Sequence, residues 1–156
     1  MKPSLRKPHH LLALGFGAGL APCAPGTAGT LVAVPFYLAL EALATPWYLA
    51  AVAALFVLGV WICGRTARDL GRADPGAIVW DEIVGYLATM VMAPHGWSWI
   101  AVGFVLFRIF DIFKPWPVNL ADRALHGGLG IMLDDLLAAG YAWIGMHALA
   151  YALARL

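Results

Sequence analysis

The sequence has few charged residues, almost no cysteine and no excess of charge of either sign. Only 12% of its 156 residues are charged, against roughly 25% in an ordinary soluble domain. The formal net charge of +1 gives no basic excess of the kind that binds nucleic acid, so no nucleic-acid partner is expected. Cys23 and Cys63 form no C-x-x-C pair, and this argues against a disulfide and against a zinc site.

What the sequence has in place of charge is apolar residues, which make up 62% of the chain. This composition is typical of membrane proteins, and a spanning helix uses about 20 residues. We therefore predict that residues 1–156 form a single integral-membrane domain with an all-α fold, a polytopic helical bundle with four or five spanning helices. The expected apolar segments are residues 27–44, 47–63, 77–93, 98–113 and 131–153.

The N-terminal apolar stretch, residues 11–20, is interrupted by Gly15, Gly17 and Gly19 and runs into "APCAPGTAGT". This pattern predicts a re-entrant or interfacial segment in place of a spanning helix. With such a path, every Lys and Arg except Arg155 falls on one side of the membrane. Cytoplasmic loops carry the excess of basic residues, so that side is predicted to face the cytoplasm.

Charged side chains occur inside three of the apolar segments. In "FRIFDIFKPWP", Arg108, Asp111 and Lys114 follow one another at intervals of three residues and share one face of a helix. An ion pair between Arg108 and Asp111 is the purely structural alternative. Two further helices begin with adjacent acidic residues, Asp81 with Glu82 and Asp134 with Asp135. Ionised carboxylates at such positions are costly unless they are paired with cations or bind a metal.

Two glycine-containing stretches add candidate phosphate contacts. The segment "PGTAGT" contains Gly26, Thr27, Gly29 and Thr30 at the start of a helix, where backbone N–H groups favour an anion; a simple capped turn is the alternative. His126, in "HGGLG", has three possible roles: a general acid, a hydrogen-bond donor to the phosphate, or a polar residue of the surface. The expected site combines Mg²⁺ with a phosphate. Its predicted metal ligands are Asp81, Glu82, Asp111, Asp134 and Asp135, with Arg108 and Lys114 beside them.

Four motifs resemble those of the bacterial phosphatidylglycerophosphatase A family and occur in the family's order. They are "FGAGLAPCAPGTAGT", "GAIVWDEIVG", "FRIFDIFKPWPV" with "DR" after it, and "HGGLGIMLDDLLAAG". The resemblance implies a Mg²⁺-dependent phosphatase of the bacterial inner membrane that faces the cytoplasm. It would act on phosphatidylglycerophosphate among the membrane lipids, and it adds Arg123 to the expected substrate contacts. It gives no oligomeric state.

The sequence can also be searched for the motifs of other classes of protein. The sequence lacks the C-x₅-R, K-x₆-R-P and D-x-D patterns of three other phosphatase classes. A CDP-alcohol phosphotransferase would also gather aspartates on membrane helices, but its D-G-x₂-A-R motif is missing. A transporter would place its polar residues near the bilayer midplane, whereas these lie at one end. Direct attack by water and a covalent aspartyl-phosphate remain alternative routes, and Asp111 is either a metal ligand or the group that orients Arg108.

Overall fold

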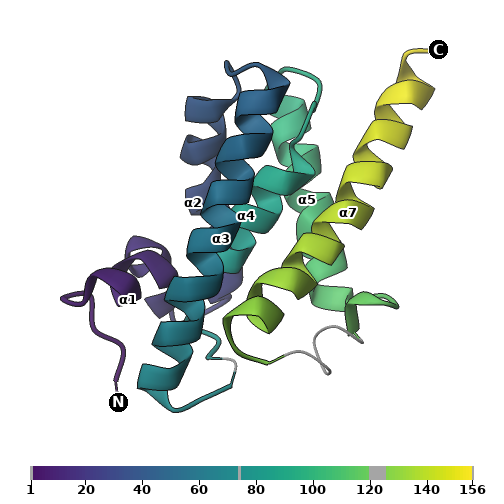
Figure 1. Ribbon diagram of the computed structural model, residues 1–156. Helices are drawn as coiled ribbons and strands as arrows, with labels where there is room; N and C mark the ends of the chain where they lie inside the picture. The colour runs from purple at the N-terminus through teal and green to yellow at the C-terminus, as the bar shows by residue number, and fades with distance from the viewer. Residues whose placement is uncertain (1, 74, 120–125, 156) are drawn as a thin grey trace.

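The computed structural model describes residues 2–73, 75–119 and 126–155, and within these ranges all regular secondary structure is helical (Figure 1). The prediction of an all-α fold is therefore confirmed. The predicted substrate contact Arg123 lies outside the described residues. In chain order, the elements are α1 (Pro8–Ala13), the 3₁₀ helix η1 (Gly15–Leu20), α2 (Pro25–Leu40), α3 (Thr45–Leu70), α4 (Trp80–Thr89), α5 (Trp97–Phe113) and α7 (Gly127–Leu153).

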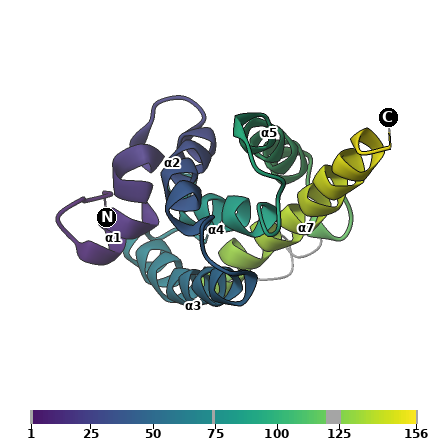
Figure 2. The ribbon, with the colours of Figure 1, turned by 90° about the horizontal axis from the view of Figure 1, so that it is seen from above.

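Helix α4 lies at the centre of the bundle. It packs against α2, α3, α5 and α7, and the view from above shows these helices around it (Figure 2). Ile83, Tyr86 and Leu87 of α4 are completely buried by these neighbours. The two acidic residues at the start of α4, Asp81 and Glu82, are partly buried among these neighbours.

Helix α4 has only 10 residues, and side chains of neighbouring helices hold its C-terminal end. The last carbonyl groups of a helix have no partner within it and need donors from elsewhere. The Tyr48 hydroxyl of α3 donates to the Leu87 carbonyl oxygen at 2.8 Å. The Trp143 indole of α7 donates to the carbonyl oxygen of Val91, just beyond α4, at 2.9 Å. The end of the short helix is thus satisfied inside an apolar bundle.

Two helices of the described part of the chain, α3 and α7, are long and apolar enough to cross a membrane. Helix α3 also leaves Trp47, Val57 and Trp61 more than half exposed, and apolar side chains of this size on an outer surface suit a lipid environment. Helix α2 is apolar but has only 16 residues. The expectation of four or five spanning helices therefore stays a prediction.

Several helix boundaries differ from those expected from hydropathy: α2 ends at Leu40 and α4 covers only Trp80–Thr89, where apolar segments 27–44 and 77–93 were expected. Helix α3 does not end near Cys63 but continues to Leu70, because Arg and Ala favour a helix as strongly as apolar residues do. It ends where Gly71 adopts a left-handed conformation with φ of 68°. Helix α7 begins at Gly127 and not at the expected residue 131, so the glycines that follow His126 in "HGGLG" belong to the helix.

The early start of α7 has a packing reason. A Cβ on Gly128 would overlap the carbonyl oxygen of Val60, and a Cβ on Gly64 would lie 3.0 Å from the Gly128 backbone nitrogen. Helices α3 and α7 therefore cross in backbone contact at these two glycines, and the absence of side chains at both positions permits the crossing.

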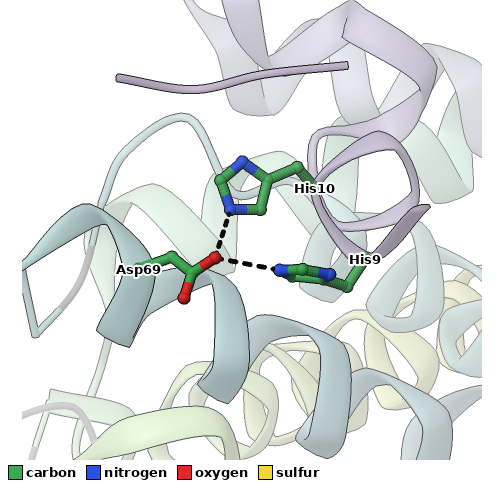
Figure 3. Close-up of side chains that lie close together, drawn as sticks. All are labelled: His9, His10 and Asp69. Carbon is green, nitrogen blue, oxygen red and sulfur yellow. Dashed lines mark hydrogen bonds and ion pairs between the residues drawn. The ribbon is translucent and has the colours of Figure 1, made fainter. Parts of the chain in front are cut away.

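The N-terminal segment forms no single helix: α1 is followed by η1, with left-handed backbone at Phe16 and Gly17. It is attached to α3 by Asp69, whose Oδ2 lies 3.1 Å from His9 Nε2 and 3.2 Å from His10 Nε2 (Figure 3). The same oxygen lies 2.7 Å from Lys7 Nζ. The Ser4 backbone N–H donates to His10 Nδ1. His10 is therefore neutral, and its Nε2–H donates to Asp69. That this segment is re-entrant or interfacial stays a prediction.

Replacing Gly128 with alanine should destabilise the bundle, because the Val60 carbonyl cannot move without its helix. We expect the free energy of unfolding to fall by about 2 kcal/mol or more, measured by thermal melting in detergent. Gly140→Ala on the same helix is the matched control, because a Cβ there meets nothing within 4 Å. An unchanged melting temperature for Gly128→Ala would contradict the backbone crossing.

His10 makes stability depend on pH. Burial lowers its pKa from the ordinary value of 6.5, so the unfolded chain takes up a proton at a higher pH than the folded chain. The contribution of His10 should be complete above about pH 6.5 and lost as pH falls through the folded pKa. His10→Gln keeps a donor and an acceptor without titrating, while Lys7, His9 and Asp69 are unchanged. Its melting temperature should fall less on acidification than that of the wild type, and equal decreases would contradict the prediction.

Candidate active site

A cavity of about 380 Å³ opens at the end of the bundle where α4, α5 and α7 meet. Most of the residues predicted from the charged motifs line it, although they come from three helices that are far apart in the sequence. The charged and polar side chains on its wall are Asp81, Glu82, Asp111, Lys114, His126, Asp134 and Asp135. The structure thus gathers all five predicted carboxylates around one space.

Three of these carboxylates form the tightest group. Asp81 and Glu82 from α4 and Asp135 from α7 each offer an oxygen, and the three oxygens lie within 4.8 Å of one another. Asp81 Oδ1, Glu82 Oε2 and Asp135 Oδ2 are buried and have no hydrogen-bond partner among the described residues. Buried carboxylate oxygens without donors are costly unless a cation joins them. A set of oxygen ligands fits a hard divalent cation such as Mg²⁺.

Two cations border the carboxylates. Arg108 bonds to Asp111, one helical turn further along α5, and its Nη1 lies 3.9 Å from Glu82 Oε1. The ion pair considered from the sequence therefore forms, and Asp111 orients Arg108 while it also lines the cavity. Lys114 Nζ lies 2.6 Å from Asp134 Oδ2. Within the described part of the site, five carboxylates face two cations, so the cavity carries an excess of negative charge.

Glycines allow the helices to approach closely enough to form the site. A Cβ on Gly26 at the start of α2 would overlap Glu82 Oε1 and lie 3.0 Å from Arg108 Nη1. A Cβ on Gly85 would lie 2.7 Å from the Phe107 ring and 3.3 Å from the Cβ of Asp135. The charged motifs do not predict Gly85. Its position four residues after Asp81, on the same helix face, is the signal that points to it.

The predicted phosphate-binding stretch only partly reaches the site. Of its four residues, Gly26 is the one that packs against Glu82 and Arg108, and none of the four lines the cavity. The Thr30 hydroxyl is buried and donates to the Gly26 carbonyl oxygen at 2.9 Å. Gly29 packs against Val79, to whose Cβ an added Cβ would lie 2.6 Å away. These contacts give Thr30 and Gly29 a packing role in the described structure, and no contact ties Thr27 to the charged group.

Comparison with known proteins gives consistent matches over most of the chain. The model of the family Phosphatidylglycerophosphatase A matches residues 11–150. A phosphatidylglycerophosphatase A of Escherichia coli (strain K12) is 47% identical over 137 residues, which cover 86% of this chain and 78% of the relative. That of Haemophilus influenzae is 46% identical over 155 residues, covering 96% and 93%.

A third similar protein carries a different description. It comes from Bacteroides thetaiotaomicron, is described as a candidate phosphatidylinositol-3-phosphatase, and is 39% identical over 142 residues, covering 86% of this chain and 88% of the relative. No solved structure matches the chain.

Gly26→Ala should impair phosphatase activity more than stability. The added Cβ would displace the Glu82 carboxylate and the Arg108 guanidinium, which are the movable ends of long side chains, so the fold can adjust while the site changes shape. We expect phosphate release to fall by about tenfold or more, because small displacements of reacting groups are costly. Gly145→Ala is the control, since a Cβ there makes only ordinary contacts with Leu106. Wild-type activity in Gly26→Ala would contradict this arrangement.

Proposed function

Because the chain belongs to the phosphatidylglycerophosphatase A family, we propose that it is a Mg²⁺-dependent phosphatase that converts phosphatidylglycerophosphate and water into phosphatidylglycerol and inorganic phosphate. The observation that carries this proposal is the group of three buried carboxylate oxygens from α4 and α7 that lack donors. The apolar helices α3 and α7 support a place in the inner membrane. The basic residues near the cavity support a site that faces the cytoplasm.

The metal would be held by Asp81, Glu82 and Asp135. Asp111 and Asp134 lie on the same cavity wall and would bind it directly or through water. Mg²⁺ usually takes only one or two carboxylates and keeps several waters, so this set of ligands is sufficient. When bound, it supplies positive charge that neutralises phosphate oxygens and activates water for attack.

The side chains of the chain itself bind and orient the phosphate. Arg108 is held by Asp111 and Lys114 by Asp134, so both cations have fixed positions before the substrate arrives. They would bind the equatorial phosphate oxygens, whose charge they stabilise as water attacks phosphorus from the opposite side to the leaving group. A cavity carboxylate would accept the proton of that water. His126, on the cavity wall, would donate a proton to the glycerol oxygen that leaves.

A covalent route competes with direct hydrolysis. In that route an aspartate of the cavity would attack phosphorus and form an aspartyl-phosphate, which water then cleaves. Acid quenching of the protein during turnover of substrate labelled in its terminal phosphate distinguishes the two. Label retained by the wild type and lost from one aspartate variant would favour the covalent route. A CDP-alcohol phosphotransferase would instead release CMP from a CDP-lipid.

Removal of the metal or of its ligands should stop phosphate release. We expect purified protein in detergent to hydrolyse phosphatidylglycerophosphate with Mg²⁺ and to lose activity in excess chelator until Mg²⁺ is restored. Asp81→Asn, Glu82→Gln and Asp135→Asn should each lower kcat by about 100-fold or more.

Glu41→Gln is the matched control for the loss of a carboxylate. Glu41 lies beyond the C-terminal end of α2 and lines a separate cavity with Tyr37 and His95. Its replacement should leave phosphate release unchanged. Full activity in all three ligand variants, or undiminished activity in chelator, would refute the proposed site.

A further inference from the structure

A second cavity, of about 460 Å³, adjoins the acidic cavity and has the opposite charge. Its wall includes Arg68, at the end of α3, and Arg72, in the chain that follows, and none of the described residues on this wall is acidic. Ala73, His126 and Gly127 line both cavities, so the two spaces share a wall. Adjoining acidic and basic cavities at one end of the bundle suit a ligand that has two separate anionic groups.

Both arginines are available to such a ligand. Among the described residues, neither Arg68 nor Arg72 forms an ion pair, and both side chains are exposed. Asp69, which follows Arg68 in the sequence, is instead bonded to Lys7, His9 and His10. In this respect the two arginines differ from Arg108 and Lys114, which are already bonded to carboxylates.

The shape of the basic cavity follows from the same helix crossing that joins α3 to α7. The backbones touch at Gly64 and Gly128, and beyond this point the end of α3 and the start of α7 enclose the cavity. A Cβ on Gly71 or on Gly127 would meet nothing within 4 Å. The space between the helix ends is therefore open and not filled by side chains of the described residues.

We propose that Arg68 and Arg72 bind the phosphodiester group of the lipid substrate while the acidic cavity binds the terminal phosphate. The inference rests on the proposed function. Phosphatidylglycerophosphate carries a diester phosphate beside the diacylglycerol and a monoester phosphate at the far end of its glycerol headgroup. Guanidinium groups bind phosphate oxygens through paired N–H donors. The shared wall at His126 places the headgroup between the two cavities.

The lipids named in the descriptions of the related proteins share this combination of a diester and a monoester phosphate. A phosphatidylinositol-3-phosphatase, the description of the Bacteroides relative, would act on a lipid in which a phosphodiester joins the diacylglycerol to a phosphorylated polyol. That arrangement of one diester and one monoester phosphate also occurs in phosphatidylglycerophosphate. A site that binds the phosphodiester group would select such lipids over phosphatidic acid, whose single phosphate is attached directly to diacylglycerol.

The test uses the full-length protein in detergent with Mg²⁺ and short-chain lipids. For the double variant Arg68→Gln/Arg72→Gln, we expect KM for phosphatidylglycerophosphate to rise by about tenfold or more, with kcat nearly unchanged. Phosphatidylglycerol, which retains the diester but lacks the monoester, should inhibit the double variant at least tenfold more weakly than it inhibits the wild type. Inhibition by inorganic phosphate should be the same for both proteins, because that ion occupies only the acidic cavity.

Arg65→Gln is the matched control. Arg65 lies on the same helix, is exposed, stacks over Trp61 at 6.0 Å and does not line the basic cavity. Its replacement removes one positive charge from the same helix, where the double variant removes two charges, and should leave KM and inhibition by phosphatidylglycerol unchanged. Unaltered KM and inhibition in the double variant, or an equal effect of Arg65→Gln, would overturn the proposal.

Failure of the proposed function would be seen separately, as a wild type that releases no phosphate from phosphatidylglycerophosphate. Direct binding of short-chain phosphatidylglycerol, followed by tryptophan fluorescence, then tests the basic cavity without turnover. Weaker binding to the double variant than to the Arg65→Gln protein supports the diester site. Equal binding to both overturns it.

Discussion

Five carboxylates gathered at one end of an apolar bundle are the constraint on which the rest of this structure depends. Their desolvation is unfavourable, and their mutual repulsion adds to it. Arg108 and Lys114 offset part of this cost through their bonds to Asp111 and Asp134. The remaining group on α4 and α7 is stable as an ionised set only with a further cation. A metal bound to this group, as we propose, would offset the rest of the cost.

The charged residues can meet around one cavity only if the helices pack closely, and glycine residues permit this packing. Gly26 brings the start of α2 against the site, Gly85 brings α4 against α5 and α7, and Gly128 lets α7 cross α3. At each position a methyl group would press on an atom of the neighbouring helix. The charged residues determine what the site can bind, but these side-chain-free contacts determine the distances between them.

The sequence predicts which charged residues gather around one cavity better than it predicts the ends of the helices that hold them. The acidic pairs stand out because charge is rare in apolar segments, and all of them line one cavity. Hydropathy misplaces the end of α3, since a helix can continue beyond the apolar run. Two features join segments that are distant in the sequence. His9 and His10 bond to Asp69, and Arg68 and His126 line the same cavity. Local patterns carry no information about such contacts.

The short central helix has a consequence for the order of assembly. Hydrogen bonds from Tyr48 of α3 and Trp143 of α7 satisfy carbonyl groups at the end of α4 and just beyond it. A ten-residue helix with free carbonyls is unstable in lipid, so α4 reaches its final state only when both neighbours are in place. Among the described helices, α7 follows α3 and α4 in the chain and is therefore synthesised after them. A nascent chain that lacks α7 therefore has neither the full set of carboxylates around the cavity nor the Trp143 indole that donates to the chain just beyond α4.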